Sequence, residues 1–211
     1  VVLAAVENNG LALEFAKGDL KKDEELVMAA VKQDGSALQH ASRELQENTN
    51  VVLAAVKNNG LALQHAKGKP KENEELVTAA VQKHGKALKY ASRELQENRD
   101  VVLAAVENNG LALEFAKGKP KENEELVMAA VKQKGRALQY ASEELQENRN
   151  VVLAAVEQDG MLALKFAKGK LRADRGVKQA AEKAQTRNEA QKRNEAELAE
   201  RQQQQLRLEE E

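Results

Sequence analysis

The residues whose types could support chemistry recur at one spacing. A ring-bearing residue returns every 25 residues, with a shift of one at the last: Phe15, His40, His65, Tyr90, Phe115, Tyr140 and Phe166. They include all five aromatic residues of the chain and two of its three histidines. Such a row could stack bases, sugars or a pigment, or it could fill gaps between packed helices. Because Leu13 and Ala16 share the predicted buried face with Phe15, we interpret the row as a structural ladder in the core.

Neither a metal site nor an active site is predicted. His40 and His65 are consecutive members of the row, but a zinc site needs two more ligands. The chain has no cysteine, and the row has no third histidine. The serines Ser42, Ser92 and Ser142 have no histidine at a consistent spacing that could act as a base. We therefore predict a protein that is not an enzyme and has no cofactor.

The whole chain repeats with the same spacing. The stretch VVLAAVKNNG at 51–60 recurs in nearly identical form from Val1, Val101 and Val151. Looser copies begin at Leu26, Leu76 and Leu126, and every copy ends on a glycine. Fixed self-similarity of this length predicts a repeat architecture in which each unit packs only on its neighbours. We number the units 1 to 7 and count positions from the first residue of each copy.

Each unit predicts two short helices. The first covers about nine positions and is apolar on all sides, so it is expected to be buried on most sides. Gly10 is expected to end it as a left-handed residue. The second helix buries Leu13 and Ala16 and exposes Glu14. Neither helix is long enough to be stable alone, so stacking must hold them.

Asparagine or aspartate at position 23 predicts the start of each following helix. These candidate N-caps are Asp23, Asn48, Asn73, Asn98, Asn123, Asn148 and Asp174. Asn50, Asp100 and Asn150 are rival caps in alternate units, and the sequence does not decide between the two sets.

Odd and even units differ, so the larger period is 50 residues. Odd units end in Ala-Lys-Gly, twice followed by proline, whereas even units end in Ala-Ser and a leucine that either extends the helix or docks on the core. Residues 1–50 and 101–150 differ at nine positions. We predict an all-α protein: an α-solenoid of short helix pairs over residues 1–176. A degenerate eighth unit over residues 177–211 continues as a polar, charged C-terminal capping helix.

The units read V-V-L-A-A-V-x-x-x-G-x-A-L-x-x-A-S-x-x-L. In this pattern they resemble a family of tandem helical repeats that is catalogued only as a domain of unknown function. The resemblance covers residues 1 to about 175, and the chain departs from it in the Ala-Lys-Gly endings and in one extra residue near Met161. It implies a repeat fold and no particular activity.

Composition excludes several partners. The chain has 33 basic and 34 acidic residues with both signs interspersed, which argues against a nucleic-acid stripe or a polybasic membrane patch. No apolar run is long enough to span a membrane and no signal peptide is visible, so membrane insertion is not expected and an intracellular protein is favoured. The sequence does not specify the compartment.

Positions 14 and 18 predict an exposed strip, because residues four apart share a face of a helix. Position 18 is glycine in odd units, and the other members are Glu14, Gln39, Arg43, Gln64, Lys89, Arg93, Glu114, Gln139, Glu143 and Lys165. Solenoids use such extended surfaces for binding. We therefore predict a non-enzymatic protein-binding scaffold whose partner is another protein or a second copy.

Other interpretations stay open. The strip could be a solvated face without a partner. The apolar first unit and the near-identical blocks indicate, as the alternative function, a structural protein that stacks end to end or forms part of a larger complex. An artificial consensus array is a further interpretation, against which the irregular unit at Met161 and the glutamine-rich tail weigh.

Overall fold

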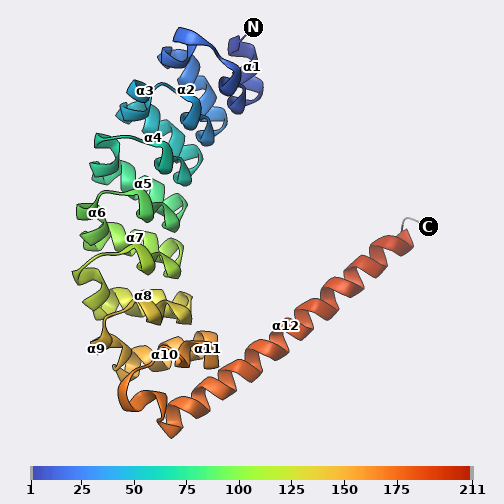
Figure 1. The fold of residues 1–211 in the computed structure, drawn as a ribbon. Helices are drawn as coiled ribbons and strands as arrows, with labels where there is room; N and C mark the ends of the chain where they lie inside the picture. Colours follow the sequence, from blue (N-terminus) through green and yellow to red (C-terminus); the bar gives the residue numbers. More distant parts are fainter. Residues whose placement is uncertain (1, 210–211) are drawn as a thin grey trace.

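The protein is a curved stack of short helices followed by one long helix (Figure 1). The computed structural model describes residues 2–209, and no strand occurs among them. The expected all-α solenoid of repeated units is therefore confirmed. None of the helices in the described part of the chain is both long enough and apolar enough to cross a membrane.

The first segment of each unit is an α-helix, as predicted. These helices are α1 (Val2–Asn8), α2 (Glu24–Gln33), α4 (Thr49–Asn58), α5 (Glu74–Lys83), α7 (Arg99–Asn108), α8 (Glu124–Gln133) and α10 (Arg149–Asp159). Their valines and one alanine form the centre of the core, where Val51, Val52, Ala55 and Val56 are fully buried in unit 3. Positions 3 and 4 are only half-buried from unit 2 to unit 7, so one side of the helix layer faces solvent.

The second segment is a 3₁₀-helix in units 1 to 6. These segments are η1 (Gly10–Phe15), η3 (Gly35–His40), η4 (Gly60–His65), η6 (Gly85–Tyr90), η7 (Gly110–Phe115) and η9 (Gly135–Tyr140). In unit 7 the extra residue replaces it with a short α-helix, α11 (Met161–Leu164).

The prediction of helix pairs is incomplete, because each unit has a third short helix. These helices are η2 (Gly18–Lys22), α3 (Arg43–Glu47), η5 (Lys69–Glu72), α6 (Arg93–Glu97), η8 (Lys119–Glu122), α9 (Glu143–Gln146) and η10 (Gly169–Arg172). The labelled members α3, α6 and α9 lie along the outer edge of the arc (Figure 1). From unit 2 to unit 6 the residue at position 20 of the unit, which lies in this helix, packs on the core, as Leu45 and Pro70 do. The leucine of the even units therefore docks and does not extend the second segment.

Odd and even units enter the third helix differently. In even units a serine caps it, as Ser92 does by accepting a hydrogen bond from the Leu95 N–H over 3.4 Å. In odd units a glycine with positive φ turns the chain, as Gly68 does at φ 61°. Proline then fits the first turn of η5, where the missing N–H costs nothing.

The glycines at position 10 have a different role from the one predicted. Among the seven, only Gly160 has a positive φ, at 55°. At Gly85 an added Cβ would lie well inside 3.0 Å of the Ala105 carbonyl oxygen of the next unit, and the same clash recurs at the other five. Glycine is needed there because the 3₁₀ segment passes directly under the following α-helix, and not because the helix ends in a left-handed residue.

Position 23 is the N-cap throughout. The Asp23, Asn73 and Asn123 side chains each accept a hydrogen bond from the backbone N–H three residues later, and the even-unit asparagines accept two. The rival Asn50 lies inside the first turn of α4, where its N–H donates to the Asn48 side chain. The predicted caps are confirmed and the rival set is excluded.

The long helix α12 (Arg175–Glu209) closes the last unit and then leaves the stack (Figure 1). Val177, Ala181 and Ala184 are buried against α10 and α11. The Asn188 side chain donates to the Gln158 carbonyl over 2.7 Å, and every residue from Glu189 to Arg207 is exposed. The first turns of α12 therefore occupy the place of an eighth first helix.

Candidate interaction face

The joints between units are held by side chains that sequence reasoning missed. The Asn108 amide accepts a hydrogen bond from the Gly85 N–H (2.7 Å) and donates to the Gln82 carbonyl (2.8 Å) of the preceding unit. Asn58 bridges units 2 and 3 in the same way. The sequence signal for this role was an amide side chain at position 8 in most units, two residues before the glycine at position 10.

A second set of amides closes the even units. The Gln146 side chain donates to the carbonyls of Leu138 (3.1 Å), Gln139 (3.2 Å) and Ala141 (3.1 Å), and Gln46 and Gln96 repeat this pattern. Leu138 and Gln139 belong to the last turn of the second segment and Ala141 is its C-cap, where helix carbonyls lack partners within the helix. The Leu138 carbonyl also accepts from the Ala141 N–H over 3.2 Å. The glutamine recurs at position 21 of every even unit, which could have indicated its role. Both sets of amides are structural, which leaves other surfaces for function.

The predicted ring ladder packs against the core, as Tyr90, Phe115, Tyr140 and Phe166 do, but its rings are not buried in it. His40, His65, Tyr90, Phe115, Tyr140 and Phe166 are half-buried, and Phe15 of the first unit is 79% exposed. The cause is the 3₁₀ geometry of the second segment, in which residues three apart share a ridge. Positions 10, 13 and 16 form the inward ridge, as Gly60, Leu63 and Ala66 do, so position 15 falls on its flank.

The ten residues of the predicted strip are exposed, but they do not form the continuous helical face that was expected. Those at position 14 lie on the second segments, except that Lys165 directly follows α11 as its C-cap. Arg43, Arg93 and Glu143 instead open separate third helices, because a serine cap starts a new helix between the two positions. Arg43 pairs along its own helix with Glu47 at 3.0 Å.

The structure brings position 14 together with the rings. The Tyr90 hydroxyl donates to Gln64 Oε1 of the preceding unit over 3.3 Å, and the Lys89 ammonium lies 5.9 Å from the Tyr90 ring centroid. Burial is the main cause that raises the pKa of Tyr140, and the neighbouring Glu114 raises it further. We use the term interaction face for the exposed surface of the second segments, formed by the seven rings and the position 14 residues beside them.

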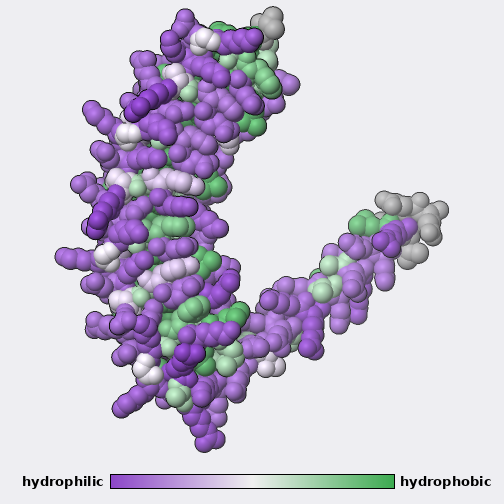
Figure 2. Space-filling view, in the orientation of Figure 1, coloured by the Kyte–Doolittle hydropathy of each residue, from purple (hydrophilic) through white to green (hydrophobic). Residues whose placement is uncertain are grey.

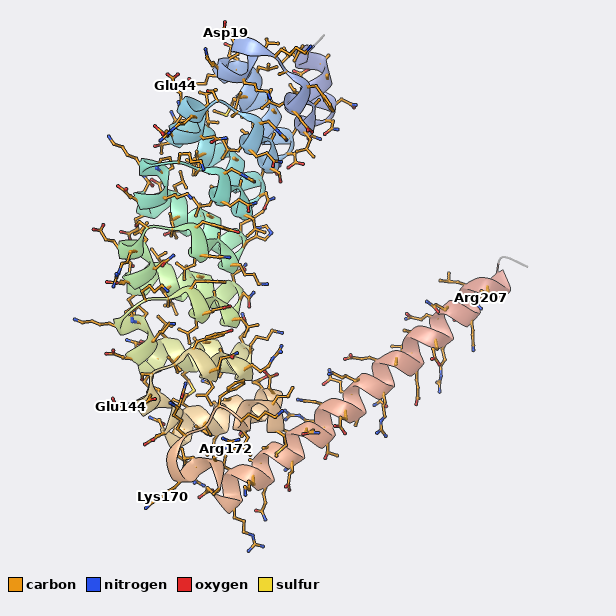
Figure 3. The ribbon with its side chains drawn as sticks, in the orientation of Figure 1. Asp19, Glu44, Glu144, Lys170, Arg172 and Arg207 are labelled. Carbon is orange, nitrogen blue, oxygen red and sulfur yellow. The ribbon has the colours of Figure 1, made fainter. Side chains whose placement is uncertain are left out.

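Charge gathers at the outer edge. Asp19, Glu44 and Glu144 point away from the stack there (Figure 3). The turns of units 3, 5 and 7 carry lysines on both sides of their glycine, as Lys67 and Lys69 do, whereas even turns are mainly acidic. Figure 2 shows a largely polar surface with apolar side chains in separate patches toward the inner side of the arc.

One groove at the end of the stack is lined mostly by polar side chains, with two apolar residues among them. It runs between α11 and α12, where Met161 and Leu162 are 37% and 52% exposed beside Lys165 and Lys192. Within the described residues, no group of three or more histidine, aspartate or glutamate side chains could hold a metal ion.

Comparison with known proteins gives a family and no activity. The model of a family described as Domain of unknown function (DUF4116) matches at residues 1–46, 23–69, 73–119 and 123–172. The last two matches begin 50 residues apart, as expected for the super-repeat. No curated protein and no solved structure matches the chain.

Proposed function

Since the chain belongs to the DUF4116 family, whose description names no activity, we propose from its surfaces that it is a non-enzymatic protein-binding scaffold. The observation that carries the proposal is the row of half-buried rings beside exposed polar residues that vary from unit to unit. A scaffold needs a rigid frame and a variable surface, and the second segments combine both.

The chemistry of the row supports a protein partner. Tyrosine and arginine are enriched among residues that dominate binding energy, because they offer large contact area and a polar end. Tyr90 and Tyr140 expose part of the ring, with Lys89 and Gln139 exposed next to them. A peptide or helix lying along the stack would meet one ring and one polar side chain in each unit.

End-to-end assembly is the second candidate, and the two ends of the stack support it unequally. In unit 1, Leu3 is 50% exposed and Ala5 is exposed, although Ala55 and Ala105 at the same position are fully buried. The other end is covered by α12, which uses the surface that an added unit would need. Growth in light scattering with rising concentration would favour this candidate.

The scaffold proposal is tested by comparing two triple variants of the full chain as baits in an extract of the source cells. Lys89→Ala/Tyr90→Ala/Tyr140→Ala removes groups from the interaction face. Lys57→Ala/Gln82→Ala/Lys132→Ala is the matched control, since it removes exposed residues of the first helices.

The proposal is supported if one protein binds the wild type and the control but not the first variant. The purified form of that protein should then bind the three baits with the same order of affinities. Circular dichroism must first establish that both variants are folded. Equal retention by all three baits, or retention of the chain alone, would reject the interaction face.

A further inference from the structure

The four odd-unit turns carry basic residues, and in three of them an acidic side chain interacts with one of the lysines. Asp19 pairs with Lys22 at 2.8 Å in the first turn, and Glu143 pairs with Lys168 in the last. In the third, the negative charge of Glu114 favours the charged form of Lys121 and partly offsets the lowering of its pKa by burial. The second turn, Lys67 to Lys71, differs because Gln64 replaces that glutamate.

This second turn is held rigidly in place. The Lys67 N–H donates to the Gln46 carbonyl over 2.9 Å, and the Lys71 carbonyl accepts from the Ser92 N–H over 2.8 Å. Pro70 is buried between them, and Gly68 has a positive φ. The two lysines therefore leave a fixed backbone, and Lys71 is itself half-buried.

Two histidines occur close to this turn, because His65 precedes Lys67 by two residues and His40 is the ring residue of the preceding unit. His40 and His65 are the half-buried ring residues of η3 and η4, which pack against each other. Burial lowers the pKa of His65, and the charges of His40, Lys67 and Lys71 lower it further. Burial also lowers the pKa of Lys71, and Lys67 adds to this effect.

The cluster has no ion-pair partner among the described residues. None of the eight ion pairs within residues 2–209 includes any of its four members. The carboxylate of Glu47 lies near Gly68, but it pairs with Arg43. His40, His65 and Lys71 are half-buried and Lys67 is exposed beside them. Groups that are or can become cationic repel one another at short range unless an anion lies between them.

We propose that His40, His65, Lys67 and Lys71 bind a phosphate group of the monoester type. A doubly charged oxyanion accepts charge-assisted hydrogen bonds from ammonium and imidazole N–H groups, and its oxygens can bridge donors from two units and a turn. This site lies at the edge of the interaction face. It therefore deepens the proposed function by predicting a phosphorylated partner, although binding of free phosphate does not depend on that function.

The chain contains its own control 50 residues further on. There the corresponding positions are Tyr90, Phe115, Lys117 and Lys121, with Glu114 beside them. The turn backbone is the same, because the Lys117 N–H donates to the Gln96 carbonyl over 2.9 Å. This second place keeps the lysines, loses both histidines and gains an acid, so it is not expected to bind.

The test is a titration of the ¹⁵N-labelled full chain with inorganic phosphate at about pH 7, where the anion carries between one and two negative charges. Sodium chloride keeps the ionic strength constant. The imidazole signals report binding directly, and the third histidine, His84, is the internal reference because its Nδ1 accepts the Gly60 N–H at a different place in the unit. We expect the His40 and His65 signals to shift together and to saturate while those of His84 stay constant.

Two matched double variants complete the test. Lys67→Gln/Lys71→Gln should weaken phosphate binding at least about tenfold, since it removes two charge-assisted contacts. Lys117→Gln/Lys121→Gln should leave binding unchanged. Saturation absent from all three histidines, equal shifts in all three, or equal effects of the two variants would overturn the proposal.

A phosphoserine peptide and its unphosphorylated form separate this proposal from the scaffold function. Preference for the phosphorylated form that depends on Lys67 and Lys71 supports the site whatever the extract experiment shows. If a protein partner binds at Tyr90 and Tyr140 while phosphate binds nowhere, the site fails and the scaffold stands.

Discussion

The close glycines at position 10 predict a clear result for Gly85→Ala. The new methyl group would lie well inside 3.0 Å of the Ala105 carbonyl oxygen and 3.1 Å from Asn109 Cβ. Relief requires η6 and α7 to separate, which also lengthens the 2.7 Å hydrogen bond from Gly85 to Asn108. Overpacking and the weakened hydrogen bond together should lower the free energy of unfolding by about 2–4 kcal/mol.

Gly118→Ala is the matched control for this change. Gly118 has φ 62°, and an added Cβ would find its nearest neighbour, Glu97, at 3.8 Å. Only the backbone conformation is then unfavourable, because φ 62° with ψ −136° lies in a region that side-chain-bearing residues rarely adopt, which costs about 1–3 kcal/mol. Urea unfolding followed by far-ultraviolet circular dichroism measures both variants.

The location of the damage gives a second readout. Since repeats contact only their neighbours, a loosened joint between units 4 and 5 should broaden or split the unfolding transition. Gly118→Ala should keep one transition. If Gly85→Ala costs no more than Gly118→Ala, the close approach of the second segment to the next helix is not what selects glycine.

Three further substitutions separate core, amide and charge effects. Leu88→Ala leaves a cavity at a fully buried site and should lower the free energy of unfolding by about 2–5 kcal/mol. Tyr90→Ala, at a half-buried ring, should lower it by about 1 kcal/mol. Equal losses of thermal stability would show that the rings contribute as much as core residues. Gln146→Ala removes the side-chain donor to three carbonyls, of which that of Leu138 keeps the Ala141 N–H. It should cost about 1–3 kcal/mol in urea unfolding, and a neutral result would show that these contacts do not contribute to stability. Because the pKa of folded His65 is lowered, the unfolded chain binds more protons, and stability falls as pH drops below the ordinary histidine value of about 6.5. His65→Phe, which copies Phe115, should therefore reduce the loss of melting temperature between about pH 7.5 and 5, and an unchanged slope would contradict the shifted pKa.

The architecture could be predicted from the sequence because its signals are local and repeated. Valine and alanine mark each first helix, and Asn73 and Asn123 mark where the next begins, through contacts spanning three residues. Seven copies of each signal remove the ambiguity that one short helix would leave. The rival cap at Asn50 was the exception, because both asparagines lie close enough to the helix start to serve.

The role of the glycines could not be predicted in the same way. A glycine after a helix suits either a left-handed residue or a close approach, and the choice depends on where the next unit lies. Gly60 and Gly68 divide these roles, since the first faces Ala80 of unit 4 and the second turns the chain. Similarly, Leu13 and Ala16 fit one face of an α-helix and one ridge of a 3₁₀-helix, so six residues cannot distinguish the two periods. The ring positions depend on that distinction, which is why the ladder was placed too deep.

The internal differences between blocks indicate which surfaces are free to change. Among the nine positions at which residues 1–50 and 101–150 differ, only the exchange of Leu20 for Pro120 involves a buried side chain in either block. The position 10 glycines, the first-helix valines and the amides that clamp neighbouring units are the same in both, because each is fixed by contact with another unit. Variation therefore falls on the ring face and on the outer turns, where Lys67 to Lys71 follows the acidic turn at Glu44 and Glu47. A partner extending over several units would meet opposite charge patterns in successive units. Its own charges would therefore have to alternate in sign from one unit of the stack to the next.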